Sequence, residues 1–251
     1  MAECGQQTGM QLGGRPPAAF GGEVLRAFLY PLKGRGVYML LGWVLIQMVF
    51  GAVRTAARIA RIGLVGGIIG LALTVYACCY LLSVVRSSAG SEDEPPDWPD
   101  LGNWWDEAVK PLVLLLGAIM ISLGPAAAAW AFQPEGRPGL QTLTWALLVA
   151  GLLWLPMNIL AAAMFESLPA WNIVRTVVAC FRVGLPYLLA CAAMAAIVAL
   201  VWAMERFLTP HIPVFGTVVS SGIGLYLMMA EMRIIGLIYR FHEDRIGWFS
   251  P

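Results

Sequence analysis

Charged residues are scarce in this chain: Asp, Glu, Lys and Arg make up only 12% of its 251 residues, whereas hydrophobic residues make up 59%. In water-soluble domains about a quarter of the residues are charged. The composition therefore excludes an ordinary soluble domain, and we predict an integral membrane protein. The formal net charge of +1 also gives no support to nucleic-acid binding, which needs a strongly basic surface.

Residues that usually carry chemistry are also few. His211 and His242 are the only histidines, and neither has a second candidate ligand one helical turn away. The five cysteines do not have the spacing of a disulfide framework. The sequence contains no phosphate-binding glycine loop and no nucleophile elbow. We therefore predict no metal and no cofactor, and an enzyme is the function class that the sequence favours least.

The first twenty residues lack the charged and apolar regions of a cleavable signal peptide and are rich in Gly and Gln. We predict a disordered tail over 1–20 and a single transmembrane domain over 21–251, which its internal helices would insert.

Long apolar runs dominate the rest of the chain, and about 20 such residues suffice to cross a bilayer. We predict an all-α, polytopic membrane helical bundle of six transmembrane helices. Whether the first run spans fully stays open, because its 17 uncharged residues are at the lower limit. The six predicted spans lie near 37–53, 62–85, 111–132, 140–165, 183–204 and 212–240.

Two segments have the pattern of amphipathic helices that lie in the membrane interface. The first, 24–33, places Leu25, Phe28 and Leu29 on one face, and the second is 168–182. A third short helix is plausible in the loop between the second and third spans. We therefore expect two or three interfacial helices beside the spans.

The distribution of basic residues predicts how the chain is oriented, because cytoplasmic flanks collect Lys and Arg. Six spans place both termini on one side of the membrane. That side also receives most of the sixteen Lys and Arg, so we predict a prokaryotic inner membrane with both termini cytoplasmic. The opposite side would hold Arg54, Arg58, Arg61, Arg137 and Arg206.

The loop 86–110 is the only long polar segment, and seven of the fifteen acidic residues fall between Glu92 and Glu107. Tryptophans beside a span favour the headgroup level, where an apolar ring and an N–H donor are both accommodated. A partner-binding loop and a merely solvated acidic connector are both compatible with this pattern. The candidate partner-binding residues are Asp97, Trp98, Asp100, Trp104 and Trp105.

The same region resembles the polytopic prokaryotic membrane proteins grouped as domain of unknown function 4013. A span ending in an aromatic and an arginine is followed by a Pro-acid-Trp-x-Asp core and a further aromatic; where the family commonly has a glycine before the tyrosine, this chain has Cys79. The resemblance implies a multi-span membrane protein and no assigned activity. The residues that carry it are Tyr80, Arg86, Pro96, Asp97, Trp98, Asp100 and Trp105.

Small residues recur at helix-packing spacing in the second and sixth spans. Such ridges let two helix backbones approach closely, although glycine is also common in membrane helices without a specific contact. We predict that these two spans are neighbours and that Arg86 pairs with Glu231, the alternative being that each charge reaches the membrane surface. The candidate packing residues are Gly63, Gly67, Gly216, Ser220 and Gly224.

Prolines interrupt the third and fourth spans at Pro125 and Pro156, with Asn158 close to the second of them. Broken helices can expose carbonyls as ligands in transporters, but an ordinary kink satisfied by a neighbouring helix is commoner. Two functions follow as hypotheses. The first is a non-catalytic scaffold or subunit of a membrane assembly, with membrane-protein partners or self-association. The second is a permease-like transporter with its site at these three residues.

Overall fold

The computed structural model describes residues 20–59, 63–90, 92–98, 102, 105–132, 138–165, 172–208 and 213–249. The predicted disordered tail lies outside these residues, apart from Phe20. All regular elements within the described residues are helical, which confirms the all-α prediction. In chain order they are α1 (Phe20–Arg26), the 3₁₀ helix η2 (Ala27–Leu32), α2 (Gly36–Ile59), α3 (Gly63–Ala89), the π-helical turn η4 (Trp105–Val109), α4 (Lys110–Ala131), α5 (Pro138–Phe165), α6 (Ile173–Val183), α7 (Leu185–Leu208) and α8 (Pro213–Ile246).

Six of these helices are long and apolar enough to cross a membrane, as predicted. Their apolar stretches are Gly36–Val53, Gly66–Ala89, Lys110–Ala131, Gly139–Phe165, Leu185–Met204 and Val219–Ile246. The predicted ranges differ from these by a few residues, and most at the last helix. The sixth span was predicted to end near residue 240; α8 extends to Ile246 but is kinked at His242, whose φ of −130° and ψ of 21° are not helical.

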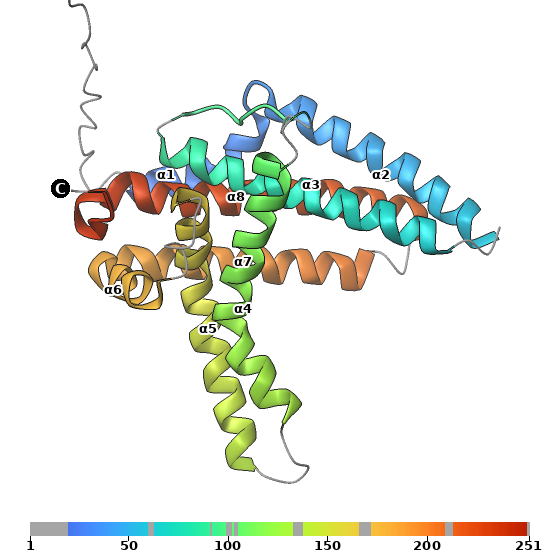
Figure 1. The fold of residues 1–251 in the computed structure, drawn as a ribbon. Coiled ribbons are helices and arrows are strands. Elements are labelled where there is room, and N and C mark those ends of the chain that lie inside the picture. Colours follow the sequence, from blue (N-terminus) through green and yellow to red (C-terminus); the bar gives the residue numbers. More distant parts are fainter. Residues whose placement is uncertain are drawn as a thin grey trace, which may run out of the picture.

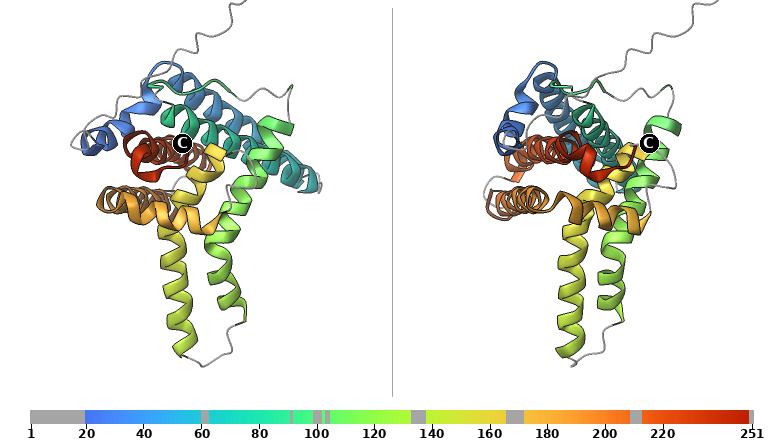
Figure 2. Two further views of the ribbon diagram at one scale, coloured as in Figure 1. Left: turned by 60° about the vertical axis from the view of Figure 1, so that its left-hand side comes forward. Right: turned by 90° about the vertical axis from the view of Figure 1, so that its left-hand side faces the viewer.

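The six long helices do not all run in one direction. In Figures 1 and 2, α2, α3, α7 and α8 lie roughly along one another, whereas α4 and α5 form a hairpin that stands crosswise and projects from them. A single membrane normal cannot be parallel to both sets. The arrangement therefore differs from a simple bundle of six parallel helices.

The second half of α5 is buried and rich in alanine. Ala161, Ala162 and Ala163 are buried there, and α5 contacts α3, α6, α7 and α8 as well as α4. Small side chains let the backbones of two helices approach closely. The outer part of the hairpin has its own close contact, because a Cβ added to Gly151 would lie 2.2 Å from the Ser122 carbonyl oxygen of α4.

The core centres on the second half of α8. Met229, Ile234, Ile235 and Leu237 are fully buried there. At Gly236, α8 packs tightly against α3, because a Cβ added there would lie 2.7 Å from the Val85 carbonyl oxygen. The second and sixth spans are thus neighbours, as predicted, since α3 and α8 form one of the most extensive helix pairs.

The two predicted amphipathic segments are helical. The first is divided into α1 and η2, and Pro31 lies inside the 3₁₀ part. The second, predicted over 168–182, contains α6. Asn172 is the N-cap of this helix, and its side chain accepts a hydrogen bond from the Arg175 backbone N–H at 3.1 Å. Both present large apolar side chains outward, such as Leu25 and Phe181.

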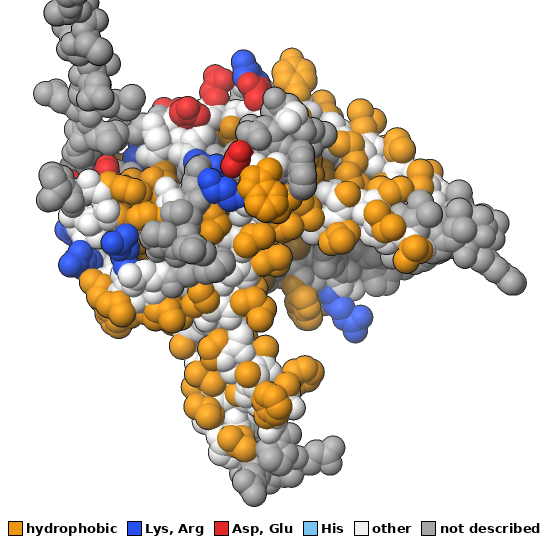
Figure 3. Space-filling model, viewed as in Figure 1, with side chains coloured by type: hydrophobic (Ala, Val, Ile, Leu, Met, Phe, Trp, Pro, Cys, Tyr) orange, Lys and Arg blue, Asp and Glu red, His pale blue; other side chains and the backbone are white. Residues whose placement is uncertain are grey.

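Among the described residues, most charged side chains lie at one end of the four lengthwise helices. In Figure 3 most of the charges on the visible face lie over this end, and hydrophobic side chains cover α2, α3 and the hairpin. Two arginines there bond to the last turns of other helices: Arg86 Nε donates to the Ala163 carbonyl at 2.8 Å, and Arg182 Nη1 to the Ile246 carbonyl at 3.2 Å. Cations are favourable at helix C-termini, where carbonyls lack helical partners.

Candidate functional site

The described part of the acidic loop, residues 92–98, lies on the protein itself. It leaves α3 through a backbone hydrogen bond from Glu92 N to the Ser87 carbonyl at 3.0 Å. The Tyr30 hydroxyl of η2 then donates to the Glu94 carbonyl at 3.2 Å. We call residues 92–98 the strap, because they cross from α3 and α8 to η2 and the start of α2.

Arg233 of α8 anchors the first half of the strap. Its side chain is only 4% exposed, and its Nη2 lies 2.9 Å from Asp93 Oδ1. Arg240 Nη1 reaches the same oxygen at 3.2 Å, and Arg233 Nη1 also donates to the Glu92 carbonyl. The Arg233 guanidinium lies over the Tyr30 ring, 4.6 Å from its centroid. A buried guanidinium is costly unless it is paired, so these contacts make the strap part of the folded structure.

The electrostatics at this anchor are consistent with the geometry. Partial burial acts to raise the pKa of Asp93, but the hydrogen bonds and charges of Arg240 and Arg233 outweigh it and leave that pKa below its ordinary value. The pKa of the Tyr30 hydroxyl is raised, mainly because burial disfavours its charged form. Asp93 is therefore ionised and Tyr30 neutral at physiological pH.

Trp98 and Asp97 anchor the second half of the strap. The Trp98 ring stacks on Tyr76 of α3, with 5.3 Å between centroids and 15° between planes, and it also contacts Tyr80 at 5.9 Å. Asp97 forms an ion pair with Arg35, just before α2. Gly34 makes the turn before α2 possible, because its φ of 46° is a conformation that residues with a Cβ rarely adopt.

The predicted partner-loop residues have different outcomes. Asp97 pairs with Arg35 although its side chain is 69% exposed, and Trp98 packs on α3, so both residues contact their own protein. Trp105 is exposed at the π-helical turn before α4. Asp100 and Trp104 lie outside the described residues.

The predicted glycine ridges make no tight contact where the structure describes their surroundings. A Cβ added to Gly67 or Gly224 would meet nothing within 4 Å. Both glycines instead line a cavity of about 780 Å³, to which Ser220 also contributes. The surroundings of Gly63 and Gly216 lie outside the described residues. The glycine spacing thus predicted the correct pair of helices. The tight contact between them lies at Gly236, which was not among the predicted packing residues.

The predicted pair of Arg86 with Glu231 is not among the ion pairs of the described residues. Arg86 bonds to the end of α5, as given above, and Glu231 is partly buried on α8. The physical reason is that α5 passes across α3, so its last carbonyls lie closer to Arg86 than the α8 carboxylate does. The ion pairs between α8 and the strap were not predicted, although Arg233 is a visible charge within an apolar run.

Two of the three predicted transport residues, Pro156 and Asn158, are buried between helices. Asn158 is 4% exposed, and its Nδ2 donates to the buried Ser122 Oγ of α4 at 2.7 Å. Near Pro156, which is buried, the Leu153 carbonyl accepts a hydrogen bond from the Tyr187 hydroxyl of α7 at 2.5 Å. The N–H that Pro156 lacks would have bonded to the Leu152 carbonyl, one residue earlier, so the Tyr187 bond joins α7 to α5 beside the proline. Pro125 is exposed on the hairpin.

Nothing in the described ranges brings three or more His, Cys, Asp or Glu side chains together as metal ligands would be. Comparisons with family models, with curated proteins and with solved structures find no match to this chain. The resemblance drawn from the loop motif therefore stays a prediction, although two of its residues, Tyr80 and Trp98, are in contact. Six long apolar helices make the chain compatible with a multi-pass membrane protein.

Proposed function

We propose that this protein is a non-catalytic component of a prokaryotic inner membrane that scaffolds or joins a larger membrane assembly. The observation that carries this proposal is the α4–α5 hairpin, which projects sideways from the four lengthwise helices (Figures 1 and 2). Its large apolar side chains are directed outward: Trp130 is 74% exposed and Trp145 60% exposed. Such an arm is suited to contact another membrane protein.

The outer hairpin has the composition of a helix-packing surface. Trp130 and Trp145 flank a crevice of about 450 Å³ that small residues, Ala126 and Ala127, help to line. Small residues let a partner helix approach in a membrane, and tryptophans are enriched at protein interfaces. The strap is less suited to this role, because Asp97 and Trp98 already have intramolecular partners.

The proposed orientation places both termini and the strap in the cytoplasm. The start of α2, the end of α3, the start of α7 and the end of α8 lie at the charged end of the molecule. Basic residues at this end include Arg35, Arg86 and Arg182. Retention of such residues on the cytoplasmic side is the general tendency of inner-membrane proteins.

Site-specific photocross-linking in native membranes tests the scaffold proposal. With p-benzoylphenylalanine at Met120 or Val149, both exposed on the hairpin, we expect a discrete adduct that mass spectrometry assigns to one membrane protein or to a second copy. The same group at Leu200, exposed on α7, is the matched control and should give no such adduct. Hairpin positions that give no protein adduct, or the same pattern as Leu200, would contradict the proposal.

The variant Asn158→Leu separates a scaffold from a permease that uses this residue. Hydrogen bonds between membrane helices contribute about 0.6 kcal/mol on average, so we expect nearly unchanged thermal stability and an unchanged cross-linked adduct. Asn158→Asp is the contrasting variant and should be strongly destabilised, because it puts a carboxylate at a buried site. Loss of cellular function in a stable, adduct-forming Asn158→Leu variant would instead favour transport.

A further inference from the structure

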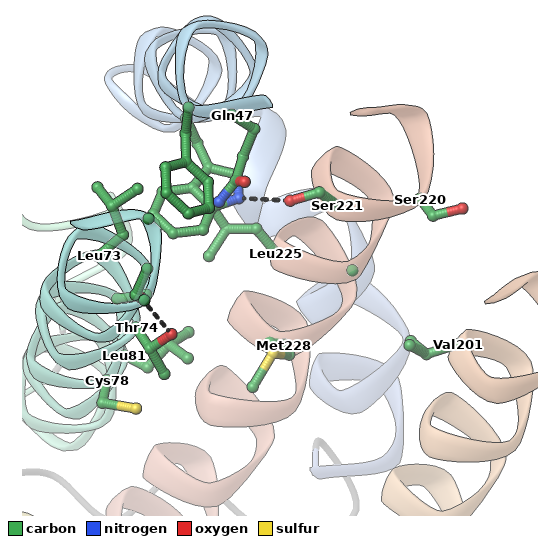
Figure 4. A pocket seen from close by; sticks show the side chains of 17 residues that line it. Gln47, Leu73, Thr74, Cys78, Leu81, Val201, Ser220, Ser221, Leu225 and Met228 are labelled. Carbon is green, nitrogen blue, oxygen red and sulfur yellow. Dashed lines mark hydrogen bonds between the residues drawn. The ribbon is translucent and has the colours of Figure 1, made fainter. Parts of the chain in front are cut away.

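A cavity of about 780 Å³ lies among α2, α3 and α8, with one residue from α7 at its edge (Figure 4). This volume falls in the range of small-molecule sites, about 300–1,000 Å³. Glycines leave the space open: a Cβ at Gly67 or Gly224 would meet nothing, and one at Gly70 would meet only the Phe50 ring, at 3.1 Å. The protein's own side chains therefore do not fill this part of the helix interface.

One wall of the cavity carries uncharged polar groups. Trp43 Nε1 of α2 donates to Ser221 Oγ of α8 at 3.1 Å, and a hydroxyl that accepts one hydrogen bond can also donate its own hydrogen. The Gln47 side chain points toward Ser221 (Figure 4), and its carboxamide offers two donors and one acceptor. On α3, the Thr74 hydroxyl donates to the Gly70 carbonyl at 2.9 Å and keeps acceptor capacity. Donors and acceptors thus face a common space.

The position and charge of the cavity restrict what can occupy it. Its lining belongs mainly to the apolar stretches of α2, α3 and α8, and no described lining residue is charged. Large apolar side chains elsewhere on α2 and α3, such as Leu45, Ile68 and Leu71, are exposed, as side chains that face hydrocarbon are. An ion would lack a counter-charge there, whereas a polar group without a hydrogen-bond partner is costly at this depth. The complementary occupant is apolar along most of its length and has a neutral oxygen.

A helix from another protein would not fit wholly inside this space. A helix about 10 Å wide that rises 1.5 Å per residue occupies about 120 Å³ per residue. The cavity would hold roughly six or seven residues of it, which is less than two turns. A single lipid chain with a small polar group fits the volume better.

We propose that this cavity binds one uncharged lipid, of the diacylglycerol type. Its hydroxyl or ester carbonyl oxygen accepts hydrogen bonds from Ser221 and Gln47. One acyl chain lies against the apolar lining formed by Leu73, Leu225 and Met228. Lipids with a charged phosphate are discriminated against, because the lining offers no cation.

Photolabelling in vesicles tests this site. The full chain is reconstituted in phosphatidylcholine with either a diacylglycerol or a phosphatidylcholine that carries a diazirine in the same acyl chain. We expect the diacylglycerol probe to label cavity peptides of α2, α3 and α8. Gln47→Leu should lower this labelling about fivefold, which is the change in affinity that corresponds to one hydrogen bond of about 1 kcal/mol. Gly224→Leu, which fills open space, should lower it at least as much.

Two controls keep the outcome decisive. Ala127→Leu in the crevice between α4 and α5 should leave the labelling unchanged, and thermal melting should show that the variants are folded. The phosphatidylcholine probe should label cavity peptides no more than other exposed faces. Equal labelling by both probes, or labelling that survives Gln47→Leu and Gly224→Leu, would overturn the proposal and leave only ordinary bilayer chains in the cavity. Absence of label at the cavity would also overturn it.

Discussion

Replacing Gly236 by alanine should destabilise the protein clearly, and leucine should prevent its folding. A Cβ at Gly236 would stand 2.4 Å from Ser88 Cβ and 2.7 Å from the Val85 carbonyl oxygen, both on α3. Neither atom is the end of a flexible side chain, so α3 and α8 would have to separate. Overpacking of this kind costs about 1–3 kcal/mol and sometimes more. A thermal-shift measurement in mild detergent, with yield as a second readout, checks this.

The matched control lies on the same helix. Gly224→Ala adds the same methyl group where it meets nothing within 4 Å, and alanine is favoured over glycine in a helix interior by up to about 1 kcal/mol. We expect unchanged or slightly raised stability at position 224. Equal behaviour of the two alanine variants would show that α3 and α8 do not meet at Gly236.

Replacing Asp93 by asparagine should release the strap while leaving the helices folded. The change removes the charge that pairs with Arg233 and Arg240 and leaves the buried Arg233 guanidinium with neutral acceptors only, whereas a hydrogen bond to a charged group contributes about 1.5–3 kcal/mol. We expect a Glu-specific protease to cleave after Glu92 much faster in Asp93→Asn than in the parent protein. Glu94→Gln, which keeps Asp93 and its ion pairs, is the matched control and should leave this rate unchanged.

This ion pair also predicts a pH dependence with a definite sign. Because the pKa of Asp93 is lower in the folded protein than in the unfolded chain, its contribution is fully present above the ordinary aspartate pKa of about 3.9. The contribution is lost as the pH falls through the lowered value. The difference in melting temperature between parent and Asp93→Asn should therefore be constant near neutrality and shrink below about pH 4. A difference that persists undiminished in acid would mean that Asp93 acts without its charge.

For the strap, residues 92–98, the sequence predicted only part of what the structure shows. Its acidity and its tryptophans marked residues 92–98 as unusual within an apolar chain. The partners of the strap could not be found in this way, because Arg233 is separated from Asp93 by 140 residues. The cavity among α2, α3 and α8 has one signal in the sequence, the amide Gln47 within the apolar run 37–53.

The glycines of α3 and α8 were likewise only partly predictable from the sequence. The sequence pattern of Gly67 and Gly224 is the one expected of a tight helix contact, yet both face open space, whereas Gly236 makes the close approach. A glycine lacks a side chain whether or not another helix lies against it. Only the position of the partner helix decides whether the resulting gap is filled. The pattern therefore identified α3 and α8 as neighbours without locating their contact.

By itself the sequence determined that the chain is helical and apolar enough for six membrane crossings, because hydrocarbon demands long uncharged runs wherever a helix meets it. The tertiary structure alone decided that the α4–α5 hairpin stands crosswise and that Arg233 and Arg240 meet Asp93. An apolar composition shows only that a helix is excluded from water and does not determine which helix it packs against. The direction in which two helices cross depends on where small residues such as Ala161 and Gly236 meet a complementary surface, and that information exists only once both surfaces are in place.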